Sequence, residues 1–478
     1  YEISECLVGS EMCIRDRRTG WSKAETLSYG QQGLILPIED MLGEMENWTT
    51  MNEESPTRKA DLTMSDGHVY TYGGENECFH CMYQHRMYIY KPWVEKYLGG
   101  KNPETTEELY NFLKMVKEDD ANGNGIDDEI PMTGYIGGWA SDPTVWMMNS
   151  FTQCVNPLSN TNPTVAGGLV VNNGKIEYAV MKDEYRDGLR YMHKLFEEGL
   201  LDNQTFLQDN TQFSATIDAS EGNKVAVYAG GGMENSEFWQ GVDGEWQNWE
   251  ILAPVAGPDG VRYSGRGIQT YFEGCLGVVS STCKYPEIVV ALFDFMASED
   301  AVHHIGGGPE GIAWKYTDEG VSLSGGTPTY EQITVPEDFD YVKDGGLSKT
   351  YANYRYTPDA MIQGSTAEFR GNMRVADPSH SGEYFFQQCA ELYSQYAPDV
   401  DTLVPNLSFE GEDAKIVTEG TLTIGGYVNQ ALVQFIDGSL DIEKDWDAYI
   451  EKLKSMGVDE YVAAYQRTYD AYMEAQGK

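Results

Sequence analysis

Side-chain oxygens recur at alternate positions in one short loop, residues 119–131, which read DDANGNGIDDEIP. Counted from Asp120, they fall at positions 1, 3, 5 and 9, a spacing that can wrap hard oxygen donors around one cation. Gly125 stands at position 6, where an EF-hand loop needs a sharp turn, but Pro131 replaces the bidentate Glu of position 12. Oxygen donors from Asp, Asn and backbone carbonyls select Ca²⁺ over zinc or copper. The ligand set would be Asp120, Asn122, Asn124, the backbone carbonyl of Ile126, Asp128 and Glu129.

The same loop has a second interpretation, a turn rich in Asn, Gly and Asp that binds no metal. The register of the oxygens favours the metal. Because the sequence shows no open coordination position and no nearby general base, a bound Ca²⁺ would be structural rather than catalytic.

The elements around the loop alternate between helical and extended patterns. Thr105 and Glu108 have the spacing of a capping box, and apolar residues then recur with helical periodicity from Leu109. The same periodicity predicts helices over 189–200, 288–296, 446–453 and 461–472. Short β-type runs lie at 68–72, 87–90, 225–230, 250–255 and 275–280. Strands interspersed with helices indicate an α/β architecture.

The composition is that of an acidic globular protein. Its 478 residues hold 76 Asp+Glu against 33 Lys+Arg, which gives a formal net charge of −43. The length suggests about two or three domains, or two lobes. Such acidity argues against nucleic acid or an anionic membrane surface as a partner, because both need clustered Lys and Arg. No apolar run approaches the roughly 20 residues that span a bilayer.

The first 17 residues, YEISECLVGSEMCIRDR, have neither helical nor strand periodicity. They resemble the translated sequencing-adapter read-through found at the edges of assembled metagenomic fragments, and we interpret residues 1–17 as a non-native segment. Farther along, Cys78 and Cys81 form a CxxC motif. A local disulfide, free thiols and redox chemistry all remain open for this pair. A Cys₄ zinc site is disfavoured because there is no second CxxC.

A family resemblance becomes specific over residues 97–131, where YLGG is followed by NPETTEELYNFLKMVKEDDANGNGIDDEIP. This stretch resembles the extracellular solute-binding proteins (family 1) of ABC sugar importers, in particular the branch with alginate-binding proteins and LplA-like lipoprotein receptors. Further matching segments lie at 29–42, 64–72, 88–99, 307–320 and 435–472. The resemblance extends from about residue 20 to residue 475.

The resemblance implies a periplasmic-binding-protein-like fold, in which two α/β lobes are joined by a hinge and the ligand cleft lies between them. We expect residues 18–82 and 268–311 in the N-terminal lobe, and residues 83–267 and 312–478 in the C-terminal lobe. The family begins with a lipobox signal and a first βαβ unit. A βαβ unit needs about 30 residues, so we expect both to be missing before Tyr29. In that branch, a loop of this pattern binds Ca²⁺.

The implied function is a receptor of an ABC importer that captures an oligosaccharide by hinge closure and delivers it to the membrane permease. The resemblance further implies a monomeric, extracellular lipoprotein with no enzymatic activity. The alternative is a secreted glycan-active hydrolase, which would hold an Asp/Glu pair about 5–10 Å apart, one with a raised pKa.

A sugar presents flat C–H faces and a ring of hydroxyls, so its receptors stack aromatic rings on it and surround them with polar groups. Trp239 is the first choice because it follows a β-type run and a glycine loop, VAVYAGGG. For each aromatic candidate, core packing is the competing interpretation, and it is favoured for Trp446 and Tyr449. The substrate-binding candidates are Trp239, Trp139, Tyr271, Trp314, Glu75, Asn76, Tyr83 and Tyr135. Glu75, Asn76 and Tyr83 form, together with His80, the first polar cluster, which follows the β-type run at 68–72.

Overall fold

The computed structural model describes most of the chain. The described residues are 14–16, 21, 23–43, 45–54, 62–72, 79–154, 168–218, 222–240, 242–265, 277–296, 298, 301, 303, 309–333, 343, 371–375, 377, 379, 381–405 and 407–475.

The chain forms two compact units, and it passes from one to the other after Cys78, Ile268 and Pro378. The first unit comprises residues 1–78 and 269–378, and the second comprises 79–268 and 379–478. Residues 312–378 were expected in the C-terminal lobe but group with the first unit. Local packing explains this, because the ring of Trp314 stacks on His303 of the same unit at a centroid distance of 4.3 Å.

The second unit is built on a four-stranded mixed sheet in the order β3-β6-β2-β7. Its strands are β2 (Arg86–Tyr90), β3 (Ile130–Thr133), β6 (Val225–Gly230) and β7 (Trp249–Leu252). β3 runs parallel to β6, whereas β2 is antiparallel to both β6 and β7. All residues of β6 are buried, which fits a central strand covered on both faces. The predicted strands at 87–90, 225–230 and 250–255 are therefore confirmed, the last one only over its first part.

Helices cover this sheet, and the predicted helix after residue 105 is confirmed. The Thr105 hydroxyl accepts a hydrogen bond from the Glu108 amide at 3.1 Å, and Leu109, Phe112, Leu113 and Val116 face the core. The first helices of the unit are α6 (Lys91–Leu98), α7 (Thr106–Glu118), α8 (Pro143–Met148), α9 (Asp183–Glu197), α10 (Asn210–Ile217) and α11 (Ser236–Gln240). A hairpin of β4 (Leu169–Asn172) and β5 (Lys175–Tyr178) and the 3₁₀ turns η1 (His80–Tyr83), η3 (Ala179–Met181), η4 (Asn203–Phe206), η5 (Glu245–Asn248) and η9 (Val400–Thr402) complete this part.

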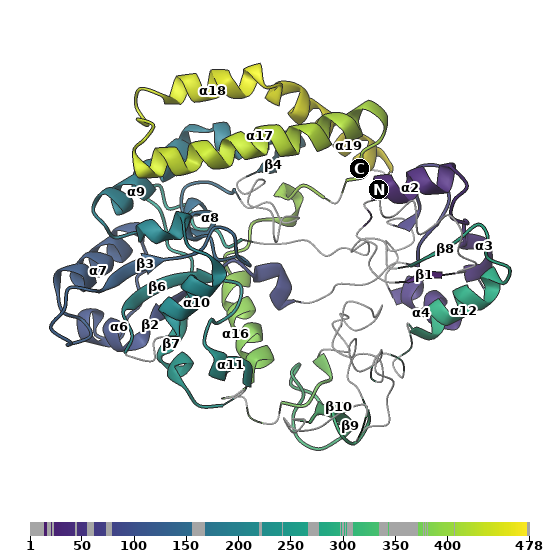
Figure 1. The fold of residues 1–478 in the computed structure, drawn as a ribbon, viewed down its shortest axis with the longest axis horizontal. Coiled ribbons are helices and arrows are strands. Elements are labelled where there is room, and N and C mark those ends of the chain that lie inside the picture. The colour runs from purple at the N-terminus through teal and green to yellow at the C-terminus, as the bar shows by residue number, and fades with distance from the viewer. Residues whose placement is uncertain are drawn as a thin grey trace. The chain divides into compact units, whose positions relative to one another are not determined.

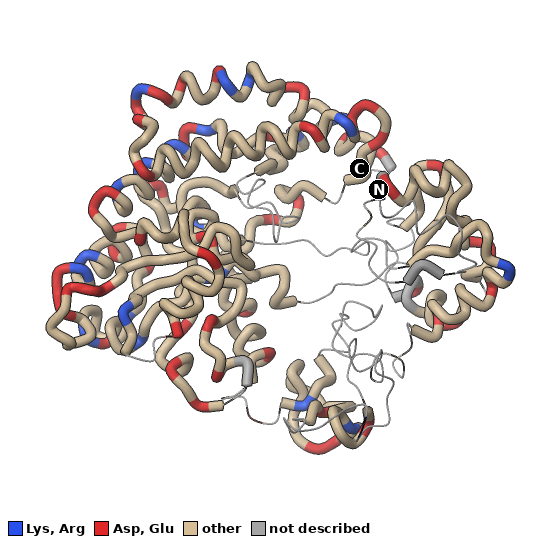
Figure 2. The backbone as a smooth tube through the Cα atoms, in the orientation of Figure 1, with Lys and Arg blue, Asp and Glu red and all other residues tan. Residues whose placement is uncertain are grey.

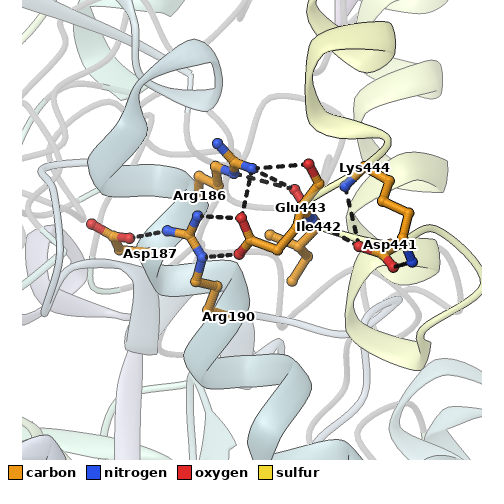
Figure 3. A network of polar contacts seen from close by, with 7 residues as sticks. All are labelled: Arg186, Asp187, Arg190, Asp441, Ile442, Glu443 and Lys444. Carbon is orange, nitrogen blue, oxygen red and sulfur yellow. Dashed lines mark hydrogen bonds and ion pairs between the residues drawn. The ribbon is translucent and has the colours of Figure 1, made fainter.

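The C-terminal helices form a layer against α9, as Figure 1 shows. The layer consists of α17 (Gly411–Asp437), α18 (Trp446–Ser455) and α19 (Val458–Ala475), with α17 packed on α9, whereas α16 (Gly382–Ser394) lies apart from it and contacts η1. A polar network joins α9 to the segment between α17 and α18 (Figure 3): the Glu443 carboxylate accepts hydrogen bonds from both Arg186 and Arg190. Arg186 also donates to the carbonyl of Ile442 at 3.0 Å. These contacts fix the turn that returns the chain from α17 to α18.

The first unit has smaller elements around a core of its own. They are β1 (Ile14–Asp16), α2 (Lys23–Gln31), α3 (Glu39–Leu42), α4 (Glu46–Glu54), β8 (Gly277–Val279), α12 (Pro286–Met296), β9 (Trp314–Tyr316) and β10 (Tyr330–Gln332). Buried Asp294 of α12 accepts hydrogen bonds from the Trp48 amide and the Tyr72 hydroxyl, both at 2.9 Å. This carboxylate therefore holds the start of α4 against α12.

Two expectations for the first unit differ from the structure. Residues 68–72 form no strand, because the Val69 amide donates to the Glu39 carboxylate and the Val69 carbonyl accepts from the Ile38 amide. Residues 14–16 lie in the segment interpreted as non-native, yet they form β1 and pair antiparallel with β8. Such a ladder uses backbone groups alone, so it sets no requirement on side-chain identity.

Acidic residues are distributed along the surface helices of the second unit, including α7 and α17–α19 (Figure 2). Many are exposed or pair with a nearby Lys or Arg, as Lys454 does with Glu451 at 2.9 Å. In the described part of the chain, no helix is both long and apolar enough to cross a membrane.

The packing of α17 on α19 gives a first prediction. A Cβ added at Gly420 would lie 2.4 Å from the ring of Tyr461, whereas one added at Gly426 of the same helix would meet nothing within 4 Å. We expect Gly420→Ala to lower the free energy of unfolding by about 1–3 kcal/mol through overpacking. Gly426→Ala should raise it by about 0.5–1 kcal/mol, because alanine favours the helix. Urea unfolding followed by circular dichroism measures both changes, and equal effects would contradict this account.

Candidate ligand platform and metal loop

The parallel pairing of β3 with β6 gives the sheet two functionally different sides. We call the side where the two strands begin the amino edge and the side where they end the carboxyl edge. Both strands begin at one edge, where Ile130 pairs with Val225, and both run toward the other, where Thr133 pairs with Tyr228. The loops that follow them, residues 134–142 and 231–235, therefore emerge side by side. Ligands of open α/β sheets bind outside the carboxyl ends of the strands.

An exposed tryptophan lies at this carboxyl edge. Trp139 is 46% exposed, and its carbonyl accepts a hydrogen bond from the Gly231 amide at 2.8 Å. Its ring lies directly on Gly231, because a Cβ added there would be 2.4 Å from a ring carbon. Its Nε1 donates to Oε1 of Gln84 at 2.6 Å, which fixes the orientation of the ring. We call Trp139 with Gly231 the Trp139 platform; it is a fixed apolar ring of the kind that stacks on a sugar.

Polar groups stand close in sequence to the platform. Glu234 is half-buried, and it accepts a hydrogen bond from the Ser214 hydroxyl at 2.6 Å. Burial raises the pKa of the Glu234 carboxyl. The Asn235 side chain is fully buried, and neither its oxygen nor its nitrogen has a hydrogen-bond partner within the described residues. Tyr135, a predicted candidate, is half-buried and packs near Phe213 at a centroid distance of 6.3 Å.

Two predicted ligand residues are buried instead. Trp314 is 1% exposed beneath His303, and Tyr83 is 3% exposed, with its ring against Phe79. Both rings are packed into the protein, so neither offers a face to a sugar in this structure. This is the core-packing interpretation that the sequence left open for each aromatic. Tyr271, Glu75 and Asn76 lie outside the described residues, and Trp239 lies in α11, where its side chain is not described.

The first polar cluster is partly described. Cys81 is disulfide-bonded. It is therefore neither a free thiol nor part of a reduced CxxC pair in this structure. His80 is half-buried, with its Nε2 3.0 Å from the Glu383 carboxylate and its ring stacked on Phe386. His80 is therefore engaged with α16.

The candidate metal loop, residues 119–131, lies at the opposite edge of the sheet, where β3 and β6 begin. Its polar groups converge on one another: the Asp120 carboxylate accepts from the amides of Asn124 and Gly125, at 2.9 and 2.8 Å. The Asn122 and Asn124 side-chain amides donate to Asp128 at 3.1 and 3.0 Å. The Asn122 amide nitrogen of the backbone donates to Glu129 at 3.2 Å. Gly125 has φ 78°, which permits the sharp turn.

This donor set fits a hard cation, although no acidic cluster marks it. Among the described residues, no group of three or more His, Cys, Asp or Glu is arranged to hold a metal ion. The loop instead mixes carboxylates with the amide oxygens of Asn122 and Asn124, which is a donor chemistry that suits Ca²⁺. Lys224, next to β6, lies 2.8 Å from Asp128 Oδ2, and this hydrogen bond lowers the pKa of the Asp128 carboxyl.

Sequence reasoning missed the residues that support Trp139. Gly231 and Gln84 act only through contact with its ring. The run of glycines after β6 was a usable signal for Gly231, because glycine often marks a close approach of another group to the backbone. No local pattern identifies Gln84.

Comparison with known proteins places the chain in a class. No family model matches it. A solved extracellular solute-binding protein from Bifidobacterium longum subsp. infantis has a TM-score of 0.77 at 20% identity, covering 98% of this chain and 89% of that one. The chain therefore has the periplasmic-binding-protein-like fold of the solute-binding proteins, as the sequence predicted.

Among curated proteins, the chain is similar to the fructooligosaccharide ABC transporter substrate-binding protein FusA of Streptococcus pneumoniae serotype 4. The two are 25% identical over 469 residues, which cover 95% of this chain and 79% of FusA. An EF-hand mutant of S. pneumoniae FusA in complex with fructo-nystose has a TM-score of 0.70 at 21% identity, covering 96% of this chain and 88% of that one. These similarities confirm the expected resemblance to the sugar-binding proteins of ABC transporters.

The partial burial of Glu234 predicts a pH dependence of stability. Because burial raises its pKa above the ordinary value of 4.5, the folded state favours the protonated carboxyl. This preference stabilises the folded protein fully at a pH below the pKa that Glu234 has in the unfolded chain. The stabilisation is lost as the pH rises through the higher pKa that Glu234 has in the folded protein. We expect Glu234→Gln to unfold at higher urea concentration than the wild type at pH 7, with the difference shrinking at about pH 4. A difference that is the same at both pH values would contradict the assignment.

Proposed function

We propose that this protein is the extracellular substrate-binding receptor of an ABC importer, which captures an oligosaccharide by closure of its two units and delivers it to the permease. The similarity to FusA over 95% of the chain supports this class. The observation that carries the binding site is the Trp139 platform, an exposed ring fixed at the carboxyl edge of parallel strands. Stacking on a sugar face is what such a ring does best.

Several finer points belong to the same proposal. The receptor does no chemistry in this proposal: of the two carboxyls in the loops that follow β3 and β6, Glu234 accepts a hydrogen bond from the Ser214 hydroxyl, and Asp142 accepts one from the Thr144 amide at the start of α8. It acts as a monomer held at the cell surface by a lipid anchor. A neutral oligosaccharide suits the net charge of −43 better than a polyanion does, because like charges repel.

A structural Ca²⁺ completes the proposal. Asp120, Asn122, Asn124, Asp128 and Glu129 would hold it with their side chains, and Ile126 would hold it with its carbonyl. When bound, the ion would neutralise the carboxylates and fix the loop that leads into β3. Because this loop lies at the edge where β3 and β6 begin, the ion would stabilise the sheet without touching a ligand on Trp139. The EF-hand named for the FusA mutant supports a similar loop in a relative.

Binding of a neutral fructooligosaccharide tests the platform. We expect kestose or nystose to change the tryptophan fluorescence of the wild type, and Trp139→Ala to weaken binding about tenfold or more. Trp139→Phe should fall between the two, because it keeps a flat ring but loses the bond to Gln84.

Two outcomes would count against the proposal. Binding unaffected by Trp139→Ala would move the site elsewhere. Hydrolysis of labelled kestose or nystose by the purified full-length protein would favour the glycan-active hydrolase.

Removal of calcium tests the metal loop. With Ca²⁺ at about 100 times its dissociation constant, binding should stabilise the fold by about 2.7 kcal/mol, so a chelator should lower the melting temperature by several degrees. Asp120→Asn and Glu129→Gln should abolish this shift. Asp127→Asn is the matched control, because it removes a neighbouring charge from outside the ligand set and should leave the shift in place. A chelator without effect on the wild type would exclude a structural Ca²⁺.

A further inference from the structure

Arg86, the first residue of β2, is a buried cation at the carboxyl edge of the sheet, where the Trp139 platform also lies. The side chain of Arg86 is 0% exposed; among the described residues it donates hydrogen bonds to two carbonyls and lies over a ring, and no carboxylate pairs with it. Nη1 donates to the carbonyl of Gly231, and Nη2 donates to the carbonyl of His80 at 2.6 Å. Burial of a cation without a carboxylate partner is costly, so this guanidinium is a conspicuous feature of the edge.

The two carbonyls belong to different parts of the second unit. Gly231 carries the ring of Trp139. His80 is the first residue of η1. It comes two residues after Cys78, where the chain passes into the second unit. Arg86 therefore connects the ligand platform directly to the start of this segment.

A second entry segment lies against the same guanidinium. The Arg86 carbon Cζ lies 4.7 Å from the ring centroid of Phe386, in α16, which begins shortly after the chain re-enters the unit behind Pro378. His80 stacks on Phe386, with a centroid distance of 5.3 Å, and its Nε2 lies 3.0 Å from Glu383. One side chain thus joins the platform to two of the three segments through which the chain passes between the units.

We propose that Arg86 is a positioning residue that couples occupancy of the Trp139 platform to the segments at these two crossings. A guanidinium is planar and its donors form a rigid fork, so a shift of the Gly231 carbonyl is passed on to the His80 carbonyl. A close-packed interior transmits such a shift rather than absorbing it. The inference rests on the proposed function, since it assigns the ligand to Trp139.

The test measures amide hydrogen exchange at three places: the 231–235 loop, η1 and the first half of α16. Without ligand, Arg86→Met should speed exchange at η1 and at Gly231 by about tenfold or more, because two carbonyl contacts are lost. Arg86→Lys keeps the charge but not the fork, so it should lose the coupling as well.

Arg186→Met is the matched control. Arg186 also donates to a carbonyl, that of Ile442, and its Cζ lies 5.8 Å from the ring centroid of Trp446. It belongs to the network of Figure 3, which joins α9 to the α17–α18 segment. Its replacement should speed exchange there and leave η1 unchanged.

The coupling itself is read from the response to kestose. In the wild type, the sugar should slow exchange both in the 231–235 loop and at η1. In Arg86→Met, and in Arg86→Lys if the Met variant does not fold, protection of the loop should persist while protection of η1 is lost. Full protection of η1 in a folded Arg86 variant would overturn the proposal.

Failure of the proposed function gives a different pattern. If kestose protects no segment of the wild type, the ligand assignment fails, and Trp139→Ala then serves as the perturbation. When Arg86 is present, Trp139→Ala should change amide exchange at η1. When Arg86 is replaced by Met, Trp139→Ala should leave exchange at η1 unchanged. An equal change at η1 in both backgrounds would overturn the coupling independently of any ligand.

Discussion

Parallel pairing of β3 with β6 is the constraint on which both candidate sites depend. Because the two strands begin at one edge and end at the other, the loops before them and the loops after them cannot meet. The candidate metal loop leads into β3 and contacts Lys224 next to β6, whereas Trp139 and Gly231 follow the same two strands. A bound cation would therefore brace the sheet from one edge and leave the other edge to the ligand.

Two glycines of the second unit matter because they have no side chain. Gly231 lets the ring of Trp139 lie on the backbone, and Gly420 lets the ring of Tyr461 lie on α17. The consequences differ with the surroundings. On the loop, the supported ring stays exposed and can serve as a platform, whereas Tyr461 is buried between helices and serves only packing.

The carboxyl edge is also where the second unit departs from an ordinary core. Within the described residues, Arg86 is buried without a carboxylate partner, and the Asn235 amide is buried without a hydrogen-bond partner. Both conditions cost free energy in an interior of low polarity. Departures of this kind concentrate at functional sites, where a group is kept for what it does rather than for stability. Their position at the same edge as the Trp139 platform agrees with the proposal that a ligand binds there.

The sequence by itself determined the features that short-range spacing controls. These include the capped helix α7, the central strand β6 and the oxygen-rich loop, and the family resemblance supplied the fold class. It missed most of α17, because the glycines and threonines of that helix are poor helix formers that tertiary packing overrides. Only the tertiary structure decided which aromatic rings are available. Trp139 is exposed on Gly231, while Trp314 and Tyr83 are buried, because burial depends on contacts between residues far apart in the chain.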